Sequence, residues 1–464
     1  MSSLWINRSR MFLFSTAIFI FVALSVGGVE TLAPFLSVFS ILALLVSFQG
    51  SGRFACGMSG LFLSVGTWLV IQRGIGIGQY VMLYGEMVYL LAMFALVPLL
   101  TLPIQIGGYG AAIQKMLMSR NVSSGQMYRS ITSIAFLLGT FLNVATIPLM
   151  TPIVKLFTAS VRMANANRFV SVAVLQCYTL PILWTPVSGV VGVIVDATGV
   201  RWLSIFPFML LLSIFGLLLN WILFSLPLAW LNPYETKGAE PDSEHSDEPH
   251  ALQHNMKKLL QIVAAIVLLI LTVLLVDSIF ALGLVVVVTL VSFPYALCWT
   301  LLLGRGRELL QETRAYFQMQ LPKMSESFLV FISAGFFLRS LQYSGTDVLL
   351  NEFVLLWSEW TGSLGLLVGL PFLTVLLAFL GIHPVVTTTL LSASLYPELL
   401  GIPVEKMAGA LLGGTMLTFM IGPYSGSVGL LSTHIGESTF RISRWNAVFA
   451  AAFFLLIVTA LVLW

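Results

Sequence analysis

The sequence contains two similar pairs of interrupted apolar segments, placed about half the chain apart. The first segment of each pair carries a Phe-Leu dipeptide shortly before a proline, at Phe141 and at Phe379. The second segment carries Pro and Gly among apolar residues, around Pro186 and Pro423. The two Phe residues are 238 positions apart and the two Pro residues 237, which indicates an internal duplication. A duplicated pair of broken hydrophobic segments is the sequence feature that best points to the binding site of a secondary transporter.

The amino-acid composition excludes an ordinary soluble domain. Hydrophobic residues make up 58% of the 464-residue chain, charged residues make up 9%, and the mean hydropathy is +0.99. Soluble domains carry about 25% charged residues, so this chain cannot cover itself with a polar surface. Its apolar runs of about 20 residues match helices that cross a bilayer rather than barrel strands. We therefore predict an all-α polytopic membrane protein, and the small net charge of +3 argues against a nucleic-acid partner.

The order of the spans predicts five regions. The linker among them carries six acidic residues and three histidines, and such a segment cannot bury enough apolar surface to fold. Each transport repeat contains a re-entrant hairpin (128–160 and 363–397) and an unwound helix (168–200 and 403–436). The regions are N-terminal scaffold helices at 1–104, transport repeat 1 at 105–230, a disordered acidic cytoplasmic linker at 231–256, scaffold helices of the second half at 257–342, and transport repeat 2 at 343–464.

The basic residues set the orientation of these spans. Most of them, such as Arg53, Lys155 and Arg168, fall on one side, which the positive-inside rule assigns to the cytoplasm. The N-terminus is then cytoplasmic, in a multi-pass protein of the cytoplasmic (inner) membrane. With this layout the first repeat enters the membrane from outside and the second from inside. We therefore predict an inverted repeat, an architecture in which two halves rock about a central site.

Each broken segment has chemistry suited to a transport site. Half-length apolar stretches cannot span a core of about 30 Å, so we predict that the first segment of each repeat is a re-entrant hairpin with a polar tip. Proline and glycine interrupt the second segment of each repeat. The interruption frees backbone carbonyls for a cation and creates helix N-termini that attract an anion. Non-helical backbone at this depth must line a cavity or be buried in protein.

The first tip also resembles a known signature. The run Asn143-Val144-Ala145-Thr146-Ile147-Pro148 resembles the Ser-Asn-Thr hairpin signature of the divalent anion–sodium symporters, the citrate and dicarboxylate carriers. Thr387-Thr388-Thr389, after the second tip, is similar to sequences of the wider ion transporter superfamily. The resemblance covers most of residues 30–464 in element order. It implies about 11 transmembrane helices plus two re-entrant hairpins in a homodimer, with Na⁺ and substrate carboxylates bound at the tips and unwound helices.

The sequence departs from that signature at several positions. Leu142 and Val144 replace its Ser and Thr, and the second copy contains Gly381-Ile382-His383. The coupling ion is therefore left open between Na⁺ and H⁺. Our candidate residues for substrate binding are Asn143, Thr146, Ser188, Gly189, His383, Thr387, Ser425, Gly426 and Ser427. Those for ion coupling are Asn143, Gly189, His383, Gly426 and Asp196.

Each candidate also has a structural explanation. Asn143 could cap the second hairpin helix, and His383 could be a neutral imidazole that hydrogen-bonds to the turn. Serines in apolar helices often bond back to the preceding turn, and Asp196 could be an interfacial residue near Arg201. Polar residues at membrane depth tend to be functional, which favours a role in transport for Asn143 and His383.

We predict a secondary active transporter that moves a small anionic solute, most simply a carboxylate, by alternating access with Na⁺ or H⁺. An exporter of arsenite or another oxyanion on the same scaffold is the main alternative. A membrane-embedded enzyme is the less favoured one, because no Ser–His pair or metal-ligand spacing occurs in the apolar segments. We expect no cofactor and no bound metal beyond the coupling ion, and partners limited to the solute, membrane lipid and a second copy of the chain.

Overall fold

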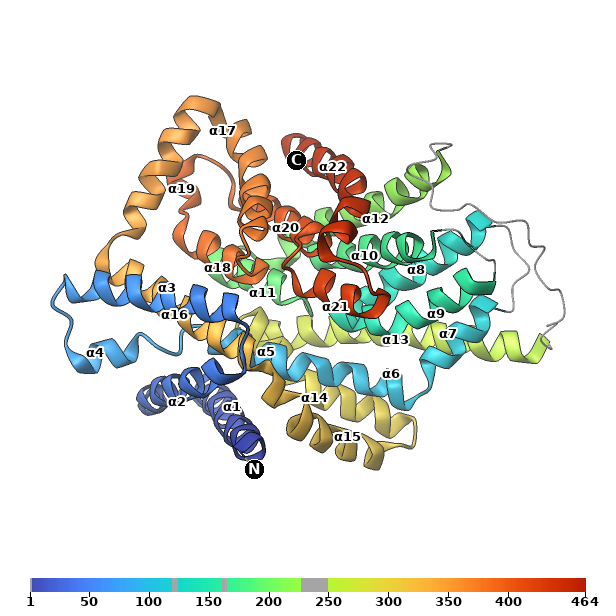
Figure 1. Cartoon of the computed structure of the whole chain (residues 1–464), viewed down its shortest axis with the longest axis horizontal. Helices are drawn as coiled ribbons and strands as arrows, with labels where there is room; N and C mark the ends of the chain where they lie inside the picture. Colours follow the sequence, from blue (N-terminus) through green and yellow to red (C-terminus); the bar gives the residue numbers. More distant parts are fainter. Residues whose placement is uncertain (1, 119–123, 161–162, 164, 227–248) are drawn as a thin grey trace. The chain divides into compact units, whose positions relative to one another are not determined.

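The computed structural model describes residues 2–118, 124–160, 163, 165–226 and 249–464 (Figure 1). These residues form helices and no β-strand, which confirms the all-α prediction. Within these described ranges, twelve helical stretches are long and apolar enough to cross a bilayer. The chain is thus a multi-pass helical membrane protein. How these twelve stretches divide into about 11 spans and two re-entrant hairpins stays a prediction.

The described chain forms two compact units. Unit 1 contains residues 1–103, 273–360 and 389–400, and unit 2 contains residues 104–272, 361–388 and 401–464. The five regions predicted from the sequence divide the chain by function, into scaffold, transport and linker segments, whereas these two units are defined by packing. The functional division stays a prediction. Most of the predicted linker, up to residue 248, lies outside the described residues, and helix α13 (Pro249–Phe280) begins within the range predicted as linker.

Unit 1 is a set of packed apolar helices. Helix α16 packs along α3 and α2, and Figure 1 shows α3 and α16 side by side. Phe14 of α1 stacks on Phe328 of α16 with ring centroids 3.7 Å apart. Arg339 of α16 donates to the Glu86 carboxylate at 2.6 Å, which joins α16 to the connection before α5. The helices are α1 (Ser2–Gly27), α2 (Ala33–Ser47), α3 (Arg53–Ile71), α4 (Ile77–Met82), α5 (Val88–Leu96), α14 (Leu284–Leu302), α15 (Gly306–Met319), α16 (Ser325–Ser344) and α19 (Pro397–Leu400).

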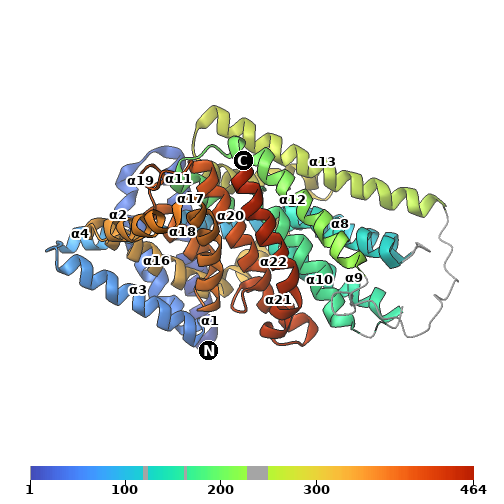
Figure 2. The ribbon, with the colours of Figure 1, turned by 90° about the horizontal axis from the view of Figure 1, so that it is seen from above.

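Unit 2 contains both pairs of interrupted segments apart from residues 389–397, which belong to unit 1. Helix α20 packs along α22, and α10 packs against α8, α9, α20 and α22; Figure 2 shows α20 beside α22. The elements are α7 (Tyr109–Met118), α8 (Ser124–Leu142), η4 (Asn143–Ala145), α9 (Thr146–Ser160), α10 (Ala166–Thr179), η5 (Leu180–Leu183), α11 (Gly189–Thr198), α12 (Trp202–Ser225), α20 (Val404–Ile421), α21 (Gly426–Ile435) and α22 (Thr439–Leu463). Helix α17 (Asp347–Phe379) is kinked at Gly362, where it passes into unit 2, and α18 (Pro384–Ser394) follows it.

Many large apolar side chains of both units are exposed. Trp360 is 89% exposed and Leu302 88%. Such exposure would cause aggregation in water, but it costs nothing in hydrocarbon, where lipid tails are as apolar as the side chains. The buried sides of the helices carry apolar residues interspersed with many serines and threonines. Serine and threonine hydroxyls there mostly donate to the carbonyl four residues earlier, as Ser40 does to Leu36 at 2.7 Å.

Candidate functional site

The first interrupted pair brings a polar turn next to a break in a helix. Asn143 begins η4 with φ of 51°, a left-handed conformation that asparagine tolerates better than most residues, and its side chain is half-buried. The Thr185 hydroxyl donates to the Thr140 carbonyl at 2.9 Å. Because Thr140 lies three residues before Asn143 and Thr185 three residues before Ser188, this bond holds the tip beside the break.

The break in repeat 1 separates η5 from α11. Pro181 is the second residue of η5, and the backbone from Trp184 to Ser188 is not helical. Ser188 occupies the N-cap position of α11, yet its side chain makes no capping bond. The Ser188 hydroxyl, on a residue 1% exposed, has no hydrogen-bond partner among the described residues, and neither does that of Thr146, at 0%. Buried polar groups are normally bonded, so these two need a partner.

Helix α8 lies very close to α10, the helix that leads into this break. A Cβ at Gly139 would lie 2.7 Å from the Tyr178 carbonyl oxygen and 2.8 Å from its Cα. Both are backbone atoms, so they cannot rotate away as a side-chain end could. Glycine at position 139 therefore permits the contact between α8 and α10.

We expect Gly139→Ala to destabilise the protein. The new methyl group must push α8 away from α10, and overpacking of this kind costs about 1–3 kcal/mol, more than alanine gains in helix propensity. The measurement is the thermal midpoint of the purified protein, which should fall by several degrees. Gly60→Ala is the matched control, since a Cβ at Gly60 of α3 would meet no atom within 4 Å. A similar midpoint for both variants would contradict the close contact.

The break in repeat 2 has the same form but bonded serines. Helix α20 ends at Ile421, the residues between Gly422 and Ser425 are not helical, and α21 begins at Gly426. The Ser425 hydroxyl accepts a hydrogen bond from the Val428 amide at 3.4 Å, which caps α21. The Ser425 and Ser427 hydroxyls lie 3.2 Å apart, and Ser427 donates to the Phe419 carbonyl. The two breaks therefore differ, because the serine hydroxyl is bonded only in repeat 2.

The second tip follows α17 and packs on α20. Gly381 has φ of 94°, which turns the chain, and the His383 carbonyl accepts from the Thr387 amide at 3.0 Å at the start of α18. His383 is half-buried; Thr387 is 2% exposed, and its hydroxyl has no partner among the described residues. A Cβ at Gly422 would lie 3.4 Å from that of Ala378, so the end of α17 touches the repeat 2 break.

Contacts between the repeats join the two breaks in unit 2. Helices α10 and α11 and the turn η5 pack against α20, and α9 and α10 pack against α21. Gly189 and Gly426 are the first residues of α11 and α21. Asp196 is exposed in the last turn of α11, about 12 Å along the helix from Ser188 at 1.5 Å per residue. The structure thus brings the candidate residues of the tips and breaks into one unit, and places Asp196 away from the break.

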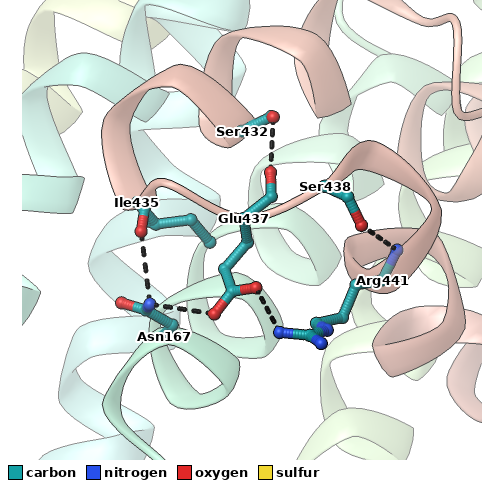
Figure 3. Close-up of polar contacts among 6 residues, drawn as sticks. All are labelled: Asn167, Ser432, Ile435, Glu437, Ser438 and Arg441. Carbon is teal, nitrogen blue, oxygen red and sulfur yellow. Dashed lines mark hydrogen bonds and ion pairs between the residues drawn. The ribbon is translucent and has the colours of Figure 1, made fainter.

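Repeat 1 also holds the far end of α21. Lys155 of α9 donates from Nζ to the His434 carbonyl at 2.6 Å, and Asn167 of α10 donates to the Ile435 carbonyl at 3.2 Å. These carbonyls belong to the last turn of α21, where helix carbonyls lack intrahelical partners and a cation is favourable. In Figure 3, Asn167 also reaches Glu437, which pairs with Arg441 at 2.8 Å. We call Lys155, Asn167, Glu437 and Arg441 the α21 clasp.

The clasp should respond to acid through Glu437. The hydrogen bond from Asn167, followed by that from Arg441, lowers the pKa of Glu437 below its ordinary 4.5. A carboxyl whose pKa is lowered by folding stabilises the protein above its unfolded pKa, and this contribution is lost as pH falls through the folded pKa. Glu437→Gln should therefore lower the thermal midpoint at pH 7, and the difference from wild type should shrink below about pH 4.5. Exposed Glu359→Gln is the control; a difference that does not vary with pH would contradict the assignment.

Three buried amides form a further polar cluster that the sequence analysis missed. Gln176 of α10 bonds to Asn220 of α12 at 2.7 Å and to Asn446 of α22 at 3.1 Å. All three are at most 4% exposed. The signal was present in the sequence, since each amide is an isolated polar residue within an apolar helix, but nothing there shows that the three helices meet. Among the described residues, no group of three His, Cys, Asp or Glu side chains could hold a metal ion.

Comparisons with known proteins support a transporter fold. The structure is similar to the crystal structure of the Alcanivorax borkumensis YdaH transporter, with a TM-score of 0.60 and 15% sequence identity. The alignment covers 89% of this chain and 97% of that one. No protein-family model and no curated protein matches the sequence. At this identity the likeness shows only that the chain shares the fold of that transporter; membership of the divalent anion–sodium symporters stays a prediction.

Proposed function

We propose that the chain is a secondary active transporter that moves a small anionic solute across the cytoplasmic membrane by alternating access. A carboxylate is the solute class that we propose, with Na⁺ or H⁺ as the coupling ion. We also propose that the working form is a homodimer with a cytoplasmic N-terminus. The transporter fold supports transport over catalysis in the membrane.

One observation carries the proposal. The hydroxyls of Thr146 and Ser188 are buried and have no partner among the described residues, next to a tip and a helix break that Thr140 and Thr185 join. Leaving a buried hydroxyl unpaired costs about 1–3 kcal/mol. A protein retains such a cost most readily where a ligand completes the bonds. These hydroxyls can coordinate a cation through oxygen or donate to an anion.

The helix starts at the two breaks supply the second part of the site. Helices α11 and α21 begin at Gly189 and Gly426, and each N-terminus carries a partial positive charge that favours an anion. Non-helical carbonyls between Trp184 and Ser188 can face a cation. We assign the anion to the helix starts and to Ser425 and Ser427.

The tips complete the proposed site. Asn143 presents an amide that can serve either ion, and Thr387 presents a buried hydroxyl. His383 contacts the anion or carries the coupling proton, since a neutral imidazole has one nitrogen that donates and one that accepts. Asp196 stays a proposed coupling residue, which acts from the last turn of α11 rather than at the break.

Thermal stabilisation tests this function. The purified protein is heated with mono-, di- and tricarboxylates and with oxyanions, each in Na⁺, in K⁺ and at two pH values. A ligand that binds the native state raises the midpoint by mass action. We expect one carboxylate class to raise it, either in Na⁺ alone or with a dependence on pH that disappears in His383→Ala. A shift by oxyanions alone favours the exporter, and no shift by any anion overturns the proposal.

A further inference from the structure

Helix α15 of unit 1 differs from its neighbours because it is charged. It follows α14 and is joined to α16 by the turn η6 (Leu321–Met324). It packs against α14, α1 and η6, and Figure 1 shows it beside α14. Its 14 residues include two arginines and two glutamates, whereas the 19 residues of α14 include no charged residue. Charged side chains are costly within hydrocarbon, so α15 belongs at the membrane surface.

The end of the preceding helix sets the depth of α15. Leu301 and Leu302, at the end of α14, are 59% and 88% exposed. Apolar side chains with this exposure need lipid around them. Helix α15 begins only four residues after Leu302, at Gly306. It therefore starts close to the boundary between the hydrocarbon and the lipid headgroups.

One face of α15 alternates arginine with large apolar residues. Its members are separated by three or four residues, which places them on one side of the helix: Arg307, Leu310, Arg314 and Phe317. Both arginines are exposed, Leu310 is 56% exposed, and Phe317 is half-buried. None of the ion pairs among the described residues includes Arg307 or Arg314. We call these four residues the basic stripe, because it offers positive charge and apolar surface together.

The glutamates of α15 lie on a different face. Glu308 and Glu312 are exposed and, at 3.6 residues per turn, lie about 100–160° around the helix from the arginines. Leu309, which is 0% exposed, faces the rest of unit 1 between the two charged faces. Glu308 also pairs with Arg305 at 3.7 Å, which weakens its repulsion of an anion. The two arginines and two glutamates of α15 cancel in charge, so it is their separation that favours an anion at the basic stripe.

We propose that the basic stripe binds anionic phospholipids. The planar guanidinium groups of Arg307 and Arg314 match a phosphate group with two parallel hydrogen bonds. Leu310 and Phe317 pack against the first carbons of the acyl chains, and the arginine stems lie along the same apolar layer. A soluble anion would satisfy the arginines but leave the apolar side chains in water, so the stripe fits a lipid better than free phosphate. This binding does not depend on the solute or on the coupling ion.

The test compares phosphatidylglycerol with phosphatidylcholine. Each lipid is titrated into the purified full chain in detergent, and bound lipid is counted by native mass spectrometry. We expect phosphatidylglycerol to bind more tightly. The double variant Arg307→Gln, Arg314→Gln should lose about 25-fold in affinity for it, at about fivefold for each arginine near a lipid surface. Equal binding of the two lipids by the wild type overturns the proposal. So does displacement of phosphatidylglycerol by glycerol 3-phosphate, which has the phosphate but no acyl chain.

Arg73→Gln is the matched control for this loss of charge. Arg73 is an exposed arginine just beyond the end of α3, and its guanidinium lies near Gly345, which follows the last residue of α16. Since α15 is joined to the start of α16, Arg73 lies at the opposite end of that helix. Arg73→Gln should keep the wild-type affinity for phosphatidylglycerol. An equal loss in this control, or no loss in the double variant, would show that the basic stripe is not the lipid site.

Spin labels test the depth of the stripe by a second route. A label is attached at Leu310→Cys or at Glu312→Cys, in a full chain whose native cysteines Cys56, Cys177 and Cys298 are replaced by alanine, and the protein is placed in phosphatidylglycerol nanodiscs. Positions 310 and 312 are both exposed, so neither label disturbs the core. We expect the label at 310 to be relaxed by oxygen dissolved in the lipid, and the label at 312 by a nickel complex dissolved in the water. A label at 310 that is relaxed mainly by the nickel complex would overturn the proposal.

Discussion

Replacing Ser188 by alanine should stabilise the protein without ligand and at the same time weaken the binding of its ligand. The Ser188 hydroxyl is buried with no partner among the described residues, so its removal relieves an unmade bond worth about 1–3 kcal/mol. If the hydroxyl serves the transported ions, its loss should also reduce ligand affinity about tenfold, the equivalent of 1.4 kcal/mol. The thermal midpoint without ligand should therefore rise by a few degrees, while the shift produced by the effective anion and cation should shrink.

Ser427→Ala provides the matched control for this prediction. Ser427 lies at the equivalent break of repeat 2, but its hydroxyl donates to the Phe419 carbonyl. Alanine there removes a bond that is made, so the midpoint without ligand should fall. If the Ser188 hydroxyl instead bonded back to its own helix, Ser188→Ala would lower the thermal midpoint in the same way. A lower midpoint in Ser188→Ala would thus show that its hydroxyl is already satisfied, and the transport site would lose its main support.

The membrane fold could be predicted because lipid constrains sequence strongly. Few charges and long apolar runs leave helices as the only practical solution, and the described residues form helices and no β-strand. The breaks could also be predicted, since Pro186 and Pro423 cannot continue a helix, and the chain is non-helical at both positions. The local sequence was therefore enough to predict the helical class and the positions of the breaks.

The partners of the polar side chains could not be predicted in this way. Ser188 and Ser425 have the same sequence context, each before a glycine that begins a helix, yet only Ser425 caps its helix. The difference depends on which backbone groups packing brings near. Likewise, Lys155 was expected only to mark the cytoplasmic side, and nothing in its neighbours shows that it reaches the His434 carbonyl, 279 residues away along the chain. Long-range pairing of this kind follows from tertiary structure alone.

Breaking the α21 clasp at Lys155 should have the second large effect. Lys155→Met keeps the apolar length of the side chain but removes the charged donor to the last turn of α21. A hydrogen bond from a charged group is worth about 1.5–3 kcal/mol, and part of this is the favourable placement of a cation at a helix C-terminus. We expect a fall of several degrees in the thermal midpoint, with partial recovery in Lys155→Arg, which restores the charge with a different shape.

The clasp should also matter to the site, because α9 and α21 each run from a proposed ion-binding end to the clasp. Helix α9 begins directly after the Asn143 turn and α21 directly after Ser425, and the two helices pack against each other. Freeing the end of α21 lets its first turn shift, about 15 Å away at 1.5 Å per residue. Lys155→Met should therefore reduce the ligand-induced shift as well as the midpoint. Lys257→Met, in α13, is the control for loss of a basic residue, and it should leave both unchanged. A normal ligand shift in Lys155→Met, despite a lower midpoint, would show that the clasp only stabilises the fold and does not position the site.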